Sequence, residues 1–194
     1  MLLHPIKMNS IKNQKILISN DAIEKIIAHA TEFVDFEKSS NLEVIGLIKG
    51  YLRTKDELVI NDAYRIREGD ETHVSFTDDD YAHFCTIPLN EEKKEFLVGW
   101  YHSHPGFGIF LSPTDLQTHA LSFQISNPNL ISLIFDPIRF INQKELMEKK
   151  QLNLTIIEIY HNCFGLFRIR NVSNLYNLDY YKLDWVLLER ESGR

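Results

Sequence analysis

The 194-residue sequence predicts one domain of the mixed α/β class, an α+β arrangement in place of a doubly wound sheet. Two observations support this class. Segments with helical spacing of apolar residues and segments with strand-like apolar runs follow one another without regular alternation. Hydrophobic residues make up 44% of the chain and charged residues 25%, which is the composition of a globular domain with a buried core.

The first expected element is a helix over residues 20–36. Asp21 and Glu24 place negative charge in its first turn, where the helix dipole favours it. The apolar residues that share one face of this helix are Ile23, Ile26, Ile27, Ala30, Phe33 and Val34.

Two strands are expected next, at 42–51 and 57–65, joined by the turn RTKD. After them, Thr77 and Asp80 fit a capping box, which predicts a second helix over roughly 78–90.

The central part of the chain opens with a buried strand at 95–104, which must end where Pro105 and two glycines begin a loop. The pair Ser112-Pro113 starts a third helix that runs to about Ser126. Another core strand is expected at 130–137.

The last part of the chain is expected to hold a polar, mobile insertion at 138–150, then strands at about 151–160 and 163–171. A helix is expected from Asn174 onward, whose apolar face either packs on the protein's own core, which is favoured, or docks another subunit. The residues of that face are Tyr176, Tyr180, Tyr181, Trp185, Val186 and Leu187.

Charge and composition exclude several classes of function. The formal net charge of -6 argues against a nucleic-acid-binding surface, which needs a basic excess. Cys85 and Cys163 are too few for a disulfide framework, so a reducing environment is expected. The N-terminus lacks the apolar core of a signal peptide, and no apolar run approaches the roughly 20 residues of a membrane span. We therefore expect a cytoplasmic protein without membrane or nucleic-acid partners.

The segment with chemical content is GWYHSHPGFGIFLSPTDLQTH. His102 and His104 are two residues apart at a strand end, and side chains at this spacing lie on the same face of a strand. Asp115, in the first turn of the next helix, can supply a third ligand. Two histidines and one carboxylate leave a fourth position for water, as in a catalytic zinc site. The sequence therefore predicts one zinc ion per chain.

Zinc lowers the pKa of its water and polarises a carbonyl, so the site also needs a proton carrier and a donor to the oxyanion. Ser112, three residues before Asp115, has a hydroxyl that can face the open side of the metal. Glu43 is the candidate proton carrier, because it interrupts the apolar run LEVIGLI. Glu57 and Glu95 are its rivals on other strands.

Each of these residues also has an ordinary structural interpretation. A bare H-x-H pair is common at strand ends. Ser112 and Asp115 fit an N-cap and its capping-box partner, with Pro113 at the first helical position. The two interpretations are compatible, since a cap can hold Asp115 in place for a metal. For His119 a solvated position is favoured over a supporting contact to the site. The two cysteines are expected to be buried small hydrophobes.

The spacing H-x-H-x7-S-x2-D, matched by His102, His104, Ser112 and Asp115, resembles the JAMM motif of the MPN-domain metalloproteases. GWYHSHPGFG followed by LSPTD is especially similar to the family members of the proteasome lid and of archaea. The resemblance implies a cytidine-deaminase-like three-layer fold, with a central mixed sheet flanked by helices. It places a catalytic domain at 18–172, between an N-terminal extension at 1–17 and a helical C-terminal extension at 173–194.

The resemblance also implies site roles and partners. His102, His104 and Asp115 would bind zinc, Glu43 would carry the proton to the leaving amine, and Ser112 would stabilise the oxyanion. The family cleaves the isopeptide bond between ubiquitin, or a ubiquitin-like modifier, and lysine. The proteasome or another MPN subunit would be its assembly partner.

Two segments near the site have open roles under this resemblance. Residues 71–77 form either an edge strand, to which a substrate tail adds by β-augmentation, or a plain connecting loop. The segment at 138–150 is longer or more charged than a minimal member needs, and insertions near the site guide the substrate tail in the resembling enzymes.

Two other functions compete with the isopeptidase. A zinc hydrolase of the same fold, trimming a sulfur-carrier protein or a peptide, would use the same residues. A non-catalytic MPN scaffold is disfavoured, because scaffolds of this family lack the ligand set that this chain keeps.

Overall fold

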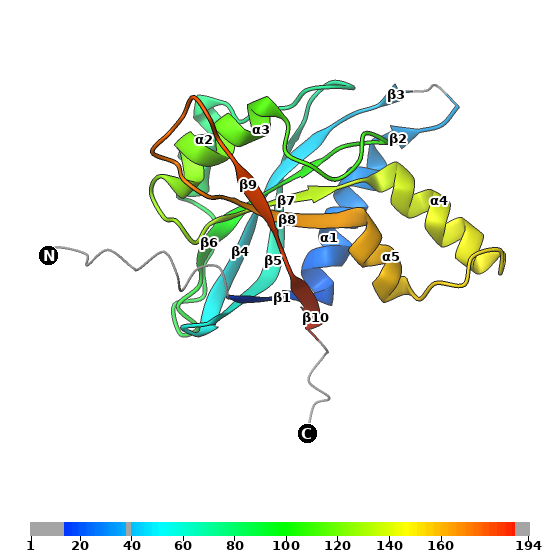
Figure 1. The fold of residues 1–194 in the computed structure, drawn as a ribbon, viewed down its shortest axis with the longest axis horizontal. Coiled ribbons are helices and arrows are strands. Elements are labelled where there is room, and N and C mark those ends of the chain that lie inside the picture. Colours follow the sequence, from blue (N-terminus) through cyan, green and yellow to red (C-terminus); the bar gives the residue numbers. More distant parts are fainter. Residues whose placement is uncertain (1–13, 38–39, 189–194) are drawn as a thin grey trace, which may run out of the picture.

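An eight-stranded mixed sheet forms the centre of the protein in a computed structural model, which describes residues 14–37 and 40–188 (Figure 1). The strand order is β10-β1-β5-β4-β6-β7-β8-β9. The strands are β1 (Lys15–Ser19), β4 (Val44–Thr54), β5 (Glu57–Glu68), β6 (Phe96–Ser103), β7 (Ile131–Phe135), β8 (Phe164–Ile169), β9 (Tyr180–Leu183) and β10 (Trp185–Leu188). A separate short hairpin pairs β2 (Val34–Asp35) with β3 (Ser40–Asn41).

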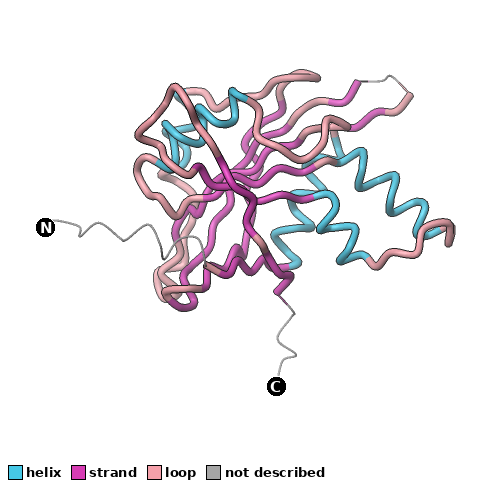
Figure 2. The backbone as a smooth tube through the Cα atoms, in the orientation of Figure 1, coloured by secondary structure: helices cyan, strands magenta, loops and turns pink. Residues whose placement is uncertain are grey.

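Helices flank this sheet in two groups, which Figure 2 shows as separate clusters of helical backbone. One group contains α1 (Asn20–Glu32), α4 (Pro137–Glu148) and α5 (Ile156–Cys163). The other contains α2 (Asp78–Phe84) and α3 (Pro113–Thr118), the latter continued by a π-helix over His119–Gln124. The mixed α/β class with a central mixed sheet flanked by helices is thus confirmed. In the part of the chain that the structure describes, no helix is long and apolar enough to cross a bilayer.

A bulge in β6 decides which way its later residues point. Ile48 of β4 pairs with Gly99 and Lys49 pairs with Leu97, so Val98 is an extra residue on β6. As a result, Val98 and Trp100 pack into different hydrophobic clusters although they are two residues apart. A Cβ at Gly99 would lie 1.8 Å from the carbonyl oxygen of Ile131 on β7, so only glycine fits at this bulge.

The C-terminal strands close the sheet. β9 pairs with β8 and β10 pairs with β1, and only Asp184 separates the two strands, so one nearly continuous segment covers both edges (Figure 1). The helix expected from Asn174 is wrong for all the residues that the structure describes. Residues 174–179 are turn and loop and 180–183 and 185–188 form strands, while 189–194 lie outside the described residues. The expected packing on the protein's own core holds for part of the predicted face. Trp185 is buried in the main hydrophobic cluster and Tyr181 and Leu187 pack against it, whereas Tyr176 and Val186 are exposed.

Two other elements differ from the sequence prediction. Of residues 138–150, those up to Glu148 belong to helix α4, which Asp136 caps and Pro137 begins, and the last two form a turn, so the segment is not an irregular insertion. The strand expected at 151–160 is absent. Residues 151–155 are loop, and helix α5 begins at Ile156 after a capping box formed by Thr155 and Glu158.

Near the site, α2 ends at Phe84, earlier than expected. Residues 71–77 form a connecting loop and not an edge strand.

A buried histidine in the main core makes stability depend on pH. His29 of α1 lies against the hydroxyl of Tyr101, with 2.6 Å between Nδ1 and the oxygen. Burial, and then the positive charge of Arg65, lower the pKa of His29 to about 4 from 6.5. The folded protein therefore keeps this imidazole neutral.

We predict that the free energy of unfolding falls as the pH is lowered from 6.5 towards 4, because the unfolded chain binds a proton at His29 that the folded chain excludes. The loss from this group is at most about 1.4 kcal/mol for each pH unit. Urea denaturation at several pH values measures it. His29→Gln keeps a polar neighbour for Tyr101 without the titration, so its stability should fall less steeply. Equal slopes in the two proteins would contradict the assignment.

Candidate metal centre

Two histidines lie side by side at the end of β6. Because of the bulge at Gly99, His102 and His104 project from the same face of the strand as Trp100. Their rings are 4.8 Å apart at right angles, and both are buried. The structure thus brings the two histidines together as the sequence predicts.

The ring of His102 is fixed by a backbone contact on its far side. Its Nδ1 lies 3.2 Å from the carbonyl oxygen of Val44, which can only accept, so Nδ1 carries the proton. The Nε2 lone pair therefore faces the pocket. There it lies 3.4 Å from Oε2 of Glu43 and 3.7 Å from Oδ1 of Asp115. A backbone acceptor behind a histidine is the usual support for a metal ligand.

The second histidine faces the other oxygen of the same aspartate. Nε2 of His104 lies 3.3 Å from Oδ2 of Asp115, while Phe110 packs 5.0 Å from the imidazole. The backbone N–H of His104 donates to Phe135 of β7 at 2.8 Å, which anchors the residue after the strand ends. Among the described residues, Nδ1 of His104 is a buried atom without a hydrogen-bond partner.

Asp115 is held by a capping box at the start of α3. The hydroxyl of Ser112 accepts the N–H of Asp115 at 3.2 Å, and the N–H of Ser112 donates to Oδ2 of Asp115 at 2.8 Å. The expected helix cap is therefore present, and it points Asp115 at the histidines. Burial alone would raise the pKa of Asp115, but hydrogen bonds from His104 and Ser112 and the nearby His102 hold it below its usual value.

Glu43 is the glutamate that reaches this pocket. It lies immediately before β4 and is buried, with its carboxylate beside His102. Its two rivals are engaged elsewhere. Glu95 pairs with the buried Lys49 at 3.0 Å, and Glu57 pairs with Arg53 at 2.9 Å.

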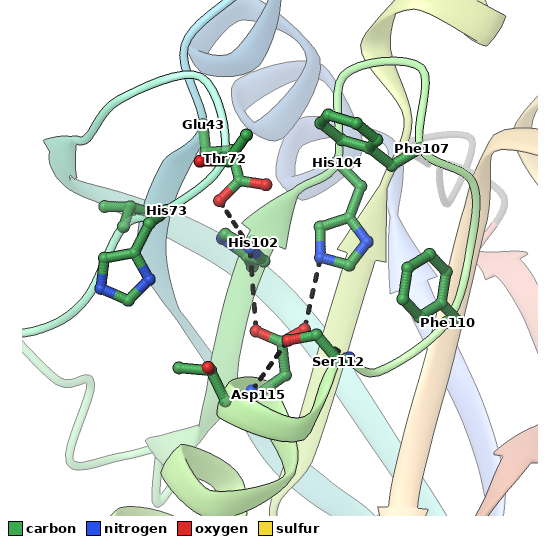
Figure 3. A pocket seen from close by; sticks show the side chains of 11 residues that line it. Glu43, Thr72, His73, His102, His104, Phe107, Phe110, Ser112 and Asp115 are labelled. Atoms are coloured by element: carbon green, nitrogen blue, oxygen red, sulfur yellow. Dashed lines mark hydrogen bonds and ion pairs between the residues drawn. The ribbon is translucent and has the colours of Figure 1, made fainter.

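These side chains line one pocket, with a cavity of about 190 Å³ (Figure 3). Glu43, Ser112 and Asp115 surround the two histidines. One wall is formed by the loop residues Thr72, His73 and Val74, and another by Phe107 and Phe110. All five residues singled out from the sequence thus lie in the same pocket.

The donor set suits a zinc ion. Ligand atoms of Glu43, His102 and His104 lie within 4.8 Å of one another, and Asp115 faces both histidines. Imidazole and carboxylate groups are the ligands of catalytic zinc sites. The hydrogen bond from Nδ1 of His102 to the Val44 carbonyl is the supporting contact that such sites have.

Neither cysteine lines this pocket. Cys163 is buried, as expected, whereas Cys85 is exposed, contrary to expectation. Burial, and then the charge of Asp136, raise the pKa of the Cys163 thiol to about 12, so it is not a nucleophile at neutral pH.

Sequence reasoning missed the role of Ser103, which lies between the two histidines. Its buried hydroxyl accepts the N–H of Val44 at 2.9 Å. The backbone carbonyl of Val44 accepts a hydrogen bond from His102. Both backbone groups of Val44 therefore bond to side chains of β6. The alternation of side chains along a strand places Ser103 on the opposite face from the histidines, but nothing in the sequence names Val44 as its partner.

The solvated position expected for His119 is wrong. His119 is fully buried in the π-helix, and its Nδ1 accepts the indole N–H of Trp100 at 3.1 Å. Burial, and then the charge of Arg168, lower its pKa to about 3, so the ring is neutral. His119 therefore supports His102 indirectly, because it holds Trp100, whose ring packs beside that of His102.

Asp136 fixes the loop that follows His104. Its Oδ1 accepts the N–H groups of Gly106 and Arg139, each at 3.0 Å, so one buried carboxylate both caps α4 and anchors the loop. The strand expected at 130–137 therefore ends at Phe135, and the Asp-Pro pair after it starts helix α4.

Comparison with known proteins identifies related sequences. The family model described as "JAB1/Mov34/MPN/PAD-1 ubiquitin protease" matches residues 11–128, which include the five pocket residues predicted from the sequence. COP9 signalosome complex subunit 5 of Neurospora crassa is 36% identical over 138 residues, which cover 68% of this chain and 38% of the relative. The Kluyveromyces lactis protein of that name is 32% identical over 182 residues, which cover 92% of this chain and 42% of the relative. The chain thus spans about two fifths of the length of these relatives.

We predict that the purified protein binds about one zinc ion per chain, and that His104→Ala abolishes this binding by removing a ligand. His73→Ala is the matched control, because His73 lines the same pocket without belonging to the ligand group. Metal analysis after dialysis measures the content. Retention of zinc by the His104 variant, or its loss from the His73 variant, would contradict the site.

Proposed function

Because this chain belongs to the JAB1/Mov34/MPN/PAD-1 family, the JAMM metalloproteases, we propose that it is a zinc-dependent isopeptidase. Its substrate is ubiquitin or a ubiquitin-like modifier attached to a lysine. The observation that carries the proposal is the convergence of two buried histidines and two buried carboxylates, with a serine hydroxyl, on one pocket (Figure 3).

His102, His104 and Asp115 would hold the zinc ion. The two oxygens of Asp115 face one Nε2 atom each, at 3.7 Å and 3.3 Å. Glu43 has such a contact with His102 alone, at 3.4 Å, although its ligand atom lies within 4.8 Å of both histidines. This difference favours Asp115 as the third ligand and leaves Glu43 for another role. A zinc ion held there would supply Lewis-acid chemistry toward a water molecule and the substrate carbonyl.

Glu43 is the proton carrier in this proposal. Its carboxylate lies beside the metal-binding histidines, within reach of a water molecule in the pocket. It accepts a proton from the attacking water and delivers it to the lysine nitrogen as the isopeptide bond breaks. The protonated amine is a far better leaving group than the amide anion.

Ser112 donates a hydrogen bond to the oxyanion. Its oxygen already accepts the N–H of Asp115, so the hydroxyl hydrogen remains available to a substrate. Because the capping box holds the Ser112 oxygen in place, the position of this donor is set before the reaction, which favours oxyanion stabilisation.

The modifier's tail would bind along the loop at Thr72–Val74. This loop forms one wall of the pocket that Glu43 and His102 also line, so a tail that reaches the site passes along it. The aromatic wall of Phe107 and Phe110 borders the pocket beside His104.

The enzyme would act as a subunit of a larger assembly. The relatives described above are named as subunits of the COP9 signalosome complex, which favours an assembly of that kind over the proteasome. A second MPN-domain protein is the natural partner within it. A cytoplasmic location remains a prediction.

We predict that Glu43→Gln retains zinc but loses about 100- to 10,000-fold in kcat, because an amide of the same shape cannot accept the proton. Cleavage of ubiquitin-type isopeptide conjugates, measured across a panel of modifiers with metal content from the same samples, gives the result. Wild-type turnover by this variant would refute the role of Glu43.

Glu57→Gln is the matched control, since Glu57 is a strand glutamate outside the pocket, and it should cleave like the wild type. A metal chelator should abolish cleavage. A thiol alkylator should not, although it will modify the exposed Cys85. The reverse pattern would exclude the zinc mechanism.

A further inference from the structure

The backbone of Glu43 is held by the start of the turn whose later residues, Thr72–Val74, form one wall of the pocket. Glu43 lies one residue beyond the last pair of the β4–β5 ladder, Val44 with Glu68. Its N–H donates to the carbonyl of Asp70 at 2.8 Å, and its carbonyl accepts the N–H of Gly69 at 2.8 Å. The position of Glu43 therefore depends on the turn formed by residues 69–74.

The Glu43 carboxylate itself has little to hold it. Within residues 14–37 and 40–188, the ion-pair or hydrogen-bond contact found for this carboxylate is the one to Nε2 of His102, at 3.4 Å. When His102 Nε2 binds a metal, that contact no longer orients the carboxylate. Its orientation then follows from the backbone of Glu43, and so from the turn.

The turn is closed by the side chain of Asp70. Oδ1 of Asp70 accepts the N–H of Thr72 at 2.9 Å and its hydroxyl at 3.3 Å, while the N–H of Asp70 donates to the carbonyl of His73 at 2.9 Å. The hydrogen bond from the Thr72 backbone is the main reason that the pKa of Asp70 lies below its usual value.

The turn is also packed tightly at its start. A Cβ on Gly69 would lie 2.2 Å from the carbonyl oxygen of His73 and 2.6 Å from Cβ of Val74. Val74 in turn is anchored in the second hydrophobic cluster. The turn thus has one compact conformation, in which the peptide groups of residues 69 and 70 face Glu43.

We propose that Asp70 is a positioning residue for the proton carrier Glu43. Asp70 is exposed and does not line the pocket, so it acts only through the turn. Its carboxylate holds the turn closed, and the closed turn aims the carbonyl of Asp70 and the N–H of Gly69 at the Glu43 backbone. The inference rests on the proposed function, because it concerns the base of that reaction.

The test compares Asp70→Ala with Asp70→Asn, whose side-chain oxygen can still accept from Thr72. Asn171→Ala is the matched control, because Asn171 is also exposed and its side chain accepts the N–H of Ser173 in a similar turn at 2.9 Å, in a loop that does not line the pocket. In Asp70→Ala we expect kcat to fall about 10- to 100-fold through misplacement of the base. kcat is measured at saturating substrate, because the same turn includes the proposed tail-binding loop at Thr72–Val74 and KM is expected to rise as well. Zinc content should be unchanged, and Asp70→Asn and Asn171→Ala should behave like the wild type.

A second readout needs no turnover. Hydrogen exchange of the metal-free protein should be faster at the Glu43 amide in Asp70→Ala, and unchanged there in Asp70→Asn and Asn171→Ala. Wild-type kcat in Asp70→Ala would overturn the proposal, as would an unchanged Glu43 amide. An equal loss in Asp70→Asn would overturn it too, because charge and not turn geometry would then be responsible. If the wild type cleaves no ubiquitin-type conjugate, the proposed function fails, and the exchange result still decides the positioning of Glu43.

Discussion

The bulge at Gly99 is the constraint on which the site depends. Side chains alternate along a strand, so a shift of one residue turns every later side chain to the other face. The bulge makes this shift within β6, and it places Trp100, His102 and His104 on the face that α3 approaches. The close approach of the Ile131 carbonyl requires glycine at this position, so the path of β7 and the direction of the histidines are set together.

Around β6, structural contacts also orient the chemical groups. Val44 bonds to the side chains of His102 and Ser103, so the end of β4 is tied to the strand that carries the histidines. The capping box of α3 stabilises the start of a helix and at the same time aims Asp115 at the histidines. Two buried carboxylates close together are costly unless cations or hydrogen bonds compensate them. A metal ion would compensate the burial of these carboxylates, and the oriented side chains suit a metal ligand set with a proton carrier, as we propose.

The sequence predicted what local signals determine. The capping box of Ser112 and Asp115, the spacing of His102 and His104, and helix α1 follow from contacts between near neighbours in the chain. The contacts of Ser103 and His119 were not predictable, because their partners Val44 and Trp100 are distant in sequence.

Non-local pairing also explains the wrong elements. Residues 180–188 have an apolar pattern that fits a helix, but they become strands because β1 and β8 leave both edges of the sheet open to them. For α5, by contrast, a local signal was present and overlooked, since Thr155 and Glu158 form a capping box.

The most direct test of this account is the position of zinc in crystals of the metal-loaded protein, located by anomalous diffraction at the zinc edge. The account predicts one peak at bonding distance, about 2.0–2.2 Å, from Nε2 of His102, Nε2 of His104 and an oxygen of Asp115, with Glu43 outside that distance. A peak bonded to Glu43 and not to Asp115 would exchange the roles of the two carboxylates. The absence of a peak between the histidines would contradict the metal centre itself.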